Sequence, residues 1–441
     1  MRQAVGSSSV TPTRRRLLGA TAGTLPALAG CPTGESGESA PTPTGATTRT
    51  WTPTGPAVGT TTAYTHLRAS GNRYLTGSGD LAGASPVALA VDGTPAWVLA
   101  AAADTGSRWT VVTEDGIATT YRVADGTAER VDATTSVWSP PVGVIADGET
   151  TVLDPPSDCA DRSHPLVLPD GLVYVAADGS VVVDRDGVTA RLPVDAPTDA
   201  RVVAVDTDRV AVYGRRTDRY RHGALGDTTE GSSLVVVDAA AGEVAGETRL
   251  DAPAAFEGLS PLVADLDNDG TPDIVTTVAT ADDGARVRVY RPDGTVRATG
   301  PRYGPGWRHQ LAVAPFAPGG VPELAVVRKP HVDRTLEFYR LAGGSLTIAA
   351  TRPGYASHTY GSRNLDQALA ADVTDAGRPA LVVPTTDRRT LAVVRRTRDG
   401  TAVPLSLGLG GRLRTNVVAV AHDDGVAVGA GTGDGVRVWT G

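Results

Sequence analysis

The chain has 441 residues and a formal net charge of −8, with 52 glycines, 31 prolines and one lysine, Lys329. Glycine and proline at this density interrupt helices, so the composition excludes a helical bundle and favours many short strands. Neither a basic stripe nor a set of regularly placed aromatic residues is present. The composition therefore argues against a nucleic-acid partner.

The first 30 residues have the features of an export signal. Three arginines at 14–16 precede a mildly apolar stretch, Leu17 to Gly30, which is too short to span a bilayer. These arginines resemble a twin-arginine signal, and the four residues that end at Cys31 resemble a lipobox. The resemblance implies that residues 1–30 are a signal peptide and that Cys31 is lipidated. The protein is then expected at the cell surface, anchored to the outer face of the cytoplasmic membrane.

Residues 31–62 are rich in threonine, proline and glycine. This composition cannot bury a core, so the segment is predicted to be a disordered tether. Residues 63–441 are predicted to form one folded domain.

Four aspartates between two apolar runs have the spacing of a calcium loop. Asp265, Asp267, Asp269 and Asp273 occupy positions 1, 3, 5 and 9, with a glycine at position 6. Ca²⁺ takes six to eight oxygen ligands, and these carboxylates together with the main-chain carbonyl of Thr271 would wrap one ion. The alternative is an acidic surface hairpin without an ion.

The loop departs from the EF-hand pattern, because position 12 is Thr276 and both flanks read as strands. A strand, a D-x-D-x-D-G-x-x-D loop and a second strand resemble the FG-GAP or VCBS-like repeat of integrin-alpha-type β-propellers. The resemblance implies an all-β propeller with one Ca²⁺, whose side-chain ligands are the four aspartates.

The pattern that starts at position 260 recurs in weaker copies at 201, 310, 367 and 416, so the copies are about 50–60 residues apart, as four-stranded blades are. We expect a single all-β propeller of seven four-stranded blades, with six or eight as alternatives. Only the copy at Asp265 keeps its carboxylates, so one ion is predicted. The last repeat has three strands, and a segment near residues 63–70 is expected to supply the fourth.

Polar residues directly precede the innermost strand of several predicted blades. We expect them to converge at one mouth of the central channel, on the face opposite the calcium loop, as a site for a small anionic ligand or a glycan. The alternative is an ordinary channel lining whose polar groups bond one another and water. The candidate ligand-binding residues are Glu257, His309, Gln310, His358, Arg363, Asp366, Gln367 and Asn416.

The predicted function is that of a surface binding or interaction module whose partner is a glycan, a small anion or a protein. The competing class is an extracytoplasmic enzyme, a hydrolase or lyase acting on an anionic or glycan substrate at the channel mouth. No nucleophile elbow, zinc motif or quinone signature supports a particular reaction. Cys159 stands between acids that disfavour its thiolate, so it is expected to be inert. The acidic, lysine-poor composition is similar to that of haloarchaeal proteins.

Overall fold

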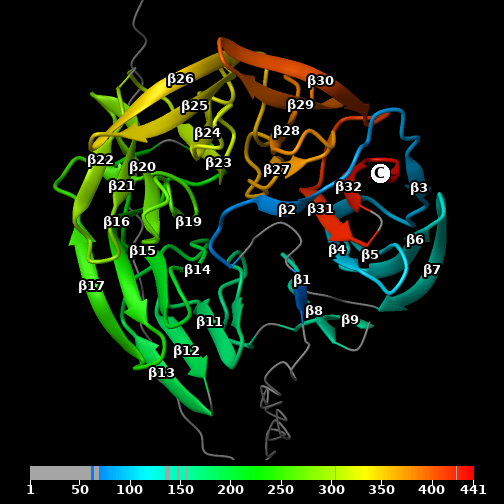
Figure 1. Cartoon of the computed structure of the whole chain (residues 1–441). Coiled ribbons are helices and arrows are strands. Elements are labelled where there is room, and N and C mark those ends of the chain that lie inside the picture. Colours follow the sequence, from blue (N-terminus) through cyan, green and yellow to red (C-terminus); the bar gives the residue numbers. More distant parts are fainter. Residues whose placement is uncertain are drawn as a thin grey trace, which may run out of the picture. The chain divides into compact units, whose positions relative to one another are not determined.

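The computed structural model describes residues 61–63, 69–134, 140–146, 149–154, 156–185, 187–221, 223–302, 304–423 and 425–441. All of them lie in one compact unit, residues 51–441, and every regular element among them is a β-strand (Figure 1). The predicted signal peptide, Cys31 and the predicted tether up to residue 60 lie outside the described residues. Among the described residues, no helix is long and apolar enough to cross a bilayer.

Most strands form antiparallel groups of four that are consecutive in sequence. The first group is β4 Pro95–Ala102, β5 Ser107–Thr113, β6 Ala118–Ala124 and β7 Thr127–Thr134. The second group is β10 Leu166–Leu168, β11 Gly171–Val175, β12 Val181–Arg185 and β13 Val188–Leu192. Between them lies a three-stranded sheet of β1 Thr61–Ala63, β8 Gly143–Ala146 and β9 Glu149–Val152.

Three further groups are hydrogen-bonded into one larger sheet. They are β14 Val203–Ala204, β15 Arg209–Thr217, β16 Glu230–Asp238 and β17 Glu243–Arg249; β19 Leu262–Ala264, β20 Asp273–Thr280, β21 Gly284–Tyr290 and β22 Val296–Thr299; and β23 Arg308–Ala314, β24 Glu323–Arg328, β25 Thr335–Ala342 and β26 Ser345–Pro353. The short strand β18, Ala255–Phe256, links the first two groups because it pairs with both β16 and β20.

The last two groups show how the chain closes on itself. Strands β27 Leu369–Asp372, β28 Ala380–Pro384, β29 Thr390–Thr397 and β30 Gly400–Gly408 form one sheet, and β2 Tyr74–Ser78 joins β27 in parallel. Strands β31 Val417–His422, β32 Gly425–Thr432 and β33 Gly435–Thr440 form the other. Its fourth strand is β3, Val87–Leu89, which pairs with β33.

An N-terminal strand therefore completes the last group, as expected, but the predicted segment is wrong. Residues 61–63 pair with β8, and Val87–Leu89 pairs with β33. The alternating apolar side chains of β3, both buried, suit a strand that packs one face on a neighbouring sheet.

Apolar side chains fill the spaces between successive groups of strands. Phe316 and Phe338 pack with Leu381 and Val383 of the next group. Trp109 packs in the same way with Val418 and its neighbours in the closing group. Sheets stacked face to face in sequence order are the blades of a β-propeller. The all-β propeller prediction is confirmed.

One short polar segment, residues 69–73, runs beside the innermost strands and is called here the central segment. It reaches four successive groups by hydrogen bonds of 2.6–2.9 Å that involve main-chain groups of β14, β19, β23 and β27. The partners of Ala69, Ser70, Asn72 and Arg73 are, in order, Ala204, Val263, Val313 and Ala370. The segment thus occupies the place where the sequence predicts an open channel mouth.

Candidate functional site

The predicted calcium loop connects β19 to β20 and brings three carboxylates together. One oxygen from each of Asp265, Asp267 and Asp269 lies within 4.8 Å of the others. Asn268 and Gly270 have φ angles of 58° and 82°, which turn the chain sharply enough to bring these side chains to one side. This cluster has the oxygen chemistry that a hard divalent cation prefers.

The fourth predicted ligand is buried at the start of β20. Asp273 Oδ2 accepts a hydrogen bond from the Leu266 N–H at 3.1 Å, whereas Oδ1 has no hydrogen-bond partner among the described residues. Burial raises the pKa of Asp273 to about 6. A buried carboxylate oxygen without a hydrogen bond fits a cation site, although here a guanidinium lies 3.4 Å from it. Thr271, predicted to contribute its carbonyl, is exposed, and its N–H donates to Asp269 Oδ1 at 2.8 Å.

Two arginines that the sequence did not indicate face the same loop. Arg291 Nη2 lies 2.9 Å from Asp269 Oδ2. Arg297 pairs with Asp267 and lies 3.4 Å from Asp273 Oδ1 and 3.5 Å from Asp269 Oδ2. Guanidinium groups therefore balance part of the acidic charge that a calcium ion would balance.

The predicted channel-mouth residue Asp366 is fully buried in an ion cluster. Its Oδ1 accepts from Arg73 Nη1 at 2.9 Å, and its Oδ2 accepts from Arg201 Nη1 at 2.8 Å. Arg73 also donates to the carbonyl of Gln310 at 3.1 Å, and Arg201 donates to the carbonyl of Arg363 at 2.7 Å. The cluster ties the central segment to two blades, so Asp366 serves the interior of the fold.

Several other predicted site residues bond to main-chain or hydroxyl groups. Gln310 accepts from Thr277 Oγ1 at 3.1 Å, and Gln367 donates to the carbonyl of Thr415 at 3.3 Å. Asn416 both accepts from and donates to the main chain of Val98 at 2.9 Å, which joins β31 to β4. His309, Gln310, Arg73 and Arg201 surround a cavity of about 30 Å³. That space has room for water but is far too small for a ligand.

A group of aromatic rings lies beside this small cavity. His309 stacks on Trp307 at 4.6 Å, and His358 lies 5.1 Å from Trp307 and 5.5 Å from His309, centroid to centroid. His358 and His331 share a hydrogen bond of 2.9 Å between their Nε2 atoms. Burial, followed by the nearby His358 and by cationic neighbours, holds the pKa of His309 well below its usual value. His309 is therefore a neutral ring packed in the interior.

Glu257, also predicted at the mouth, borders a separate cavity. This space of about 10 Å³ is lined by Glu257, Glu230 and Trp307, among others. Burial and the neighbouring Glu257 raise the pKa of Glu230 well above its usual value, a perturbation also found at functional sites. A cavity of one water's size cannot admit a substrate, however.

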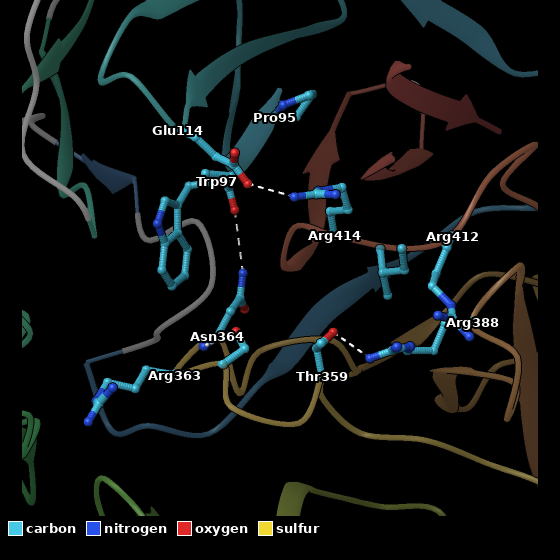
Figure 2. Close-up of a pocket in the computed structure, with 12 residues that line it drawn as sticks. Pro95, Trp97, Glu114, Thr359, Arg363, Asn364, Arg388, Arg412 and Arg414 are labelled. Carbon is cyan, nitrogen blue, oxygen red and sulfur yellow. Dashed lines mark hydrogen bonds and ion pairs between the residues drawn. The ribbon is translucent and has the colours of Figure 1, made fainter. Parts of the chain in front are cut away.

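A much larger cavity opens beside the predicted mouth, between β4, the loop 359–364 and the turns before β29 and β31. Its volume is about 490 Å³. Arginines dominate its charged lining, and Glu114 is the acidic residue among them (Figure 2). We call it the arginine cavity; its lining residues are Pro95, Ala96, Trp97, Glu114, Thr359, Ser362, Arg363, Asn364, Arg388, Arg412, Leu413 and Arg414.

Of the predicted site residues, Arg363 lines the arginine cavity. Its guanidinium pairs with Asp199 at 2.8 Å and with Asp227, and in Figure 2 it extends away from the other labelled arginines. Arg388, Arg412 and Arg414 were not predicted. Their only sequence signal is that they lie in the turns before β29 and β31, and loops that border a propeller face commonly carry function.

Cys159 is buried, and its pKa is raised to about 12 by burial and then by Asp158 and Asp161. Its thiol is therefore protonated at neutral pH, which agrees with the expectation of an inert residue.

No protein-family model matches the chain, and no curated protein matches it. Among solved structures, the chain is similar to the quinohemoprotein alcohol dehydrogenase from Comamonas testosteroni at a TM-score of 0.53 and 10% identity, over 86% of this chain and 80% of that one. BamB from Moraxella catarrhalis aligns at a TM-score of 0.43 and 13% identity, over 81% of this chain and 98% of that one. At such identities, similarity shows the fold and carries no activity. The chain is a β-propeller.

Proposed function

We propose that this protein is a binding module, displayed at the cell surface, that holds an anionic ligand in the arginine cavity. The observation that carries the proposal is the cavity itself. Its volume of about 490 Å³ falls in the range of small-molecule sites, whereas the two cavities around the predicted mouth measure about 30 and 10 Å³. The binding residues are then mainly Arg388 and Arg412, beside the predicted Arg363.

The lining supports binding more than catalysis. It contains arginines, hydroxyls and one amide, and no histidine, cysteine or aspartate is among the lining residues that the structure describes. Glu114 pairs with Arg414 at 2.7 Å. General acid–base chemistry needs a free proton donor or acceptor within reach of the substrate, and the carboxylate in the lining is held by Arg414.

The proposal also includes a lipid anchor at Cys31 and one bound Ca²⁺. The twin-arginine-like and lipobox-like motifs support export and lipidation at Cys31, and the strand–loop–strand pattern supports an FG-GAP or VCBS-like repeat. The buried Asp273 Oδ1, which accepts no hydrogen bond, and the cluster of Asp265, Asp267 and Asp269 support one structural Ca²⁺. Cys31→Ser should move the protein from the membrane fraction to the soluble fraction. Unchanged fractionation would contradict the lipid anchor.

The binding proposal is tested with the full-length protein in detergent. Citrate, tripolyphosphate and trigalacturonate are titrated by calorimetry against the wild type and against the double variant Arg388→Gln/Arg412→Gln. At least one anion should bind the wild type and lose most of its affinity for the variant. Arg249→Gln is the matched control, because Arg249 is exposed on β17 and pairs with Glu247. Equal binding to the double variant and the wild type would contradict the proposal.

A further inference from the structure

Two of the four arginines that line the arginine cavity are not neutralised by the protein. Arg363 pairs with Asp199 and Asp227, and Arg414 pairs with Glu114. Within the part of the chain that the structure describes, Arg388 and Arg412 form no ion pair. In a protein with a net charge of −8, two uncompensated guanidinium groups at one cavity attract anions.

These two guanidinium groups also affect each other. The pKa of Arg388 is lowered by burial first, and then by the positive charges of Arg412 and Arg334. Arg388 donates to Thr359 Oγ1 and to the carbonyl of His358, and Arg412 donates to the carbonyl of Asp387 at 3.4 Å. Each guanidinium has five N–H donors, so both keep donors for a ligand. An anion between them would relieve their repulsion.

Several backbone N–H groups around the cavity are already used within the protein. Phosphate sites are commonly built from free backbone N–H groups, at helix N-termini or in nests. Here the backbone N–H groups of six lining residues donate to other protein groups at 2.8–3.1 Å; they belong to Glu114, Ser362, Asn364, Arg388, Leu413 and Arg414. The charged donors of the cavity are the planar guanidinium forks, whose two parallel N–H groups match the two oxygens of a carboxylate.

The rest of the cavity suits a ring rather than a bare anion. Pro95, Trp97 and Leu413 are apolar lining residues that are mostly buried, and Ser362 and Asn364 supply hydroxyl and amide groups. Tyr360, in the same loop 359–364 but outside the lining residues, is 66% exposed, and its ring lies edge-on to His331 at 5.1 Å between centroids. Aromatic rings stack on the apolar faces of sugars, while hydroxyl and amide groups bond sugar hydroxyls.

We infer that the arginine cavity takes an acidic saccharide, and that Arg388 and Arg412 hold the carboxylate of a uronic acid unit. This inference rests on the proposed binding function and names the ligand of the same site. The carboxylate lies against the two guanidinium forks, the sugar ring covers the apolar wall, and the chain of sugars leaves past Tyr360.

The experiment compares trigalacturonic acid, its methyl ester and tripolyphosphate by calorimetry on the full-length protein in detergent. The acid should bind, and the ester, which lacks the charge, should bind at least about tenfold more weakly. Arg388→Gln and Arg412→Gln should each weaken binding of the acid by about tenfold or more, with an unchanged melting temperature. Tyr360→Ala should weaken it severalfold, and Arg249→Gln should not change it.

Each of the other possible results contradicts either the saccharide inference or the proposed anion-binding function. If tripolyphosphate binds and depends on Arg388 and Arg412 while the acid does not bind, the saccharide inference is wrong and the anion-binding function stands. If the ester binds as tightly as the acid, recognition does not depend on the carboxylate. If no probe depends on either arginine, both the inference and the proposed function fail.

Discussion

The loops that follow β19 and β27 adopt the same turn with different chemistry. In the first loop, Asp265 accepts hydrogen bonds from the N–H groups two, four and five residues later. In the second, Asp372 accepts from those two, four and six residues later. A non-glycine residue with positive φ occupies position 4 in both, Asn268 and Asp375, and a glycine with positive φ occupies position 6.

The loops differ at positions 3, 5 and 9. The first loop has Asp267, Asp269 and Asp273 there, and the second has Thr374, Ala376 and Ala380. The aspartate at position 1 forms the turn in both loops, so its presence alone does not indicate a metal site. That indication lies in the three additional carboxylates, which the turn does not require.

The largest expected effect comes from replacing Asp372, the aspartate at position 1 of the loop after β27. Asp372→Ala removes three hydrogen bonds to a buried charged group, so it should lower the free energy of unfolding by about 2–4 kcal/mol. Chemical denaturation should give the same loss with Ca²⁺ and with a chelator. A loss that appears only with Ca²⁺ would mean that the second loop also binds an ion.

The second effect concerns the carboxylates that only the first loop has. Ca²⁺ at ten times its Kd should stabilise the protein by about 1.4 kcal/mol. Asp267→Asn/Asp269→Asn should remove that increment and leave the protein insensitive to chelator in thermal unfolding. The matched control is Asp293→Asn, which alters a turn carboxylate in the hairpin between β21 and β22. An undiminished calcium response in the double variant would place the ion elsewhere.

The strands and repeats of this fold could be predicted from the sequence, whereas the central segment could not. Alternating valines and the recurring Gly-x-Pro turns predict strands and repeats, because strand periodicity and turn chemistry are local. The central segment escaped prediction, since five residues with little apolar pattern are held by strands far along the chain; Asn72 and Val313 are 241 residues apart. The polar residues before the innermost strands were therefore expected to line an open mouth, which Arg73 and its neighbours fill.

The arginine cavity escaped prediction for a related reason. Its walls come from a strand end, a loop and three turns in different blades, and no periodicity links them. Arg363 was singled out because it lies near Asp366 in sequence, yet its charge is used by Asp199 and Asp227. The predicted roles of the calcium ligands and of the mouth residues stay predictions.

A smaller effect is expected from replacing Arg297, which would compete with Ca²⁺ for the loop carboxylates. Arg297 touches three of the loop carboxylates, so its replacement by glutamine should destabilise the calcium-free protein by about 0.5–1 kcal/mol. The same change should tighten calcium binding severalfold, because the ion no longer displaces a guanidinium. Calcium titration by calorimetry checks this. Weaker calcium binding in Arg297→Gln would show that Arg297 supports the ion site rather than competing for it.

The smallest expected effect comes from introducing carboxylates at positions 3 and 5 of the loop after β27. Thr374→Asp/Ala376→Asp places carboxylates at positions 3 and 5 beside Asp372, on a turn that already has the required φ angles. Three carboxylates without a fourth at position 9 should bind Ca²⁺ weakly. The expected gain is about 0.4 kcal/mol when the calcium concentration equals Kd.

This graft is best made in the Asp267→Asn/Asp269→Asn background, where the native loop no longer responds to calcium. The melting temperature is measured with Ca²⁺ and, as a control for ionic strength, with Mg²⁺, which demands a stricter geometry and keeps its waters. Response to Ca²⁺ alone would show that the turn supplies the geometry and the extra aspartates supply the affinity. If neither ion has an effect, the buried carboxylate at position 9 is essential, because Ala380 stands in the graft where the native loop has Asp273.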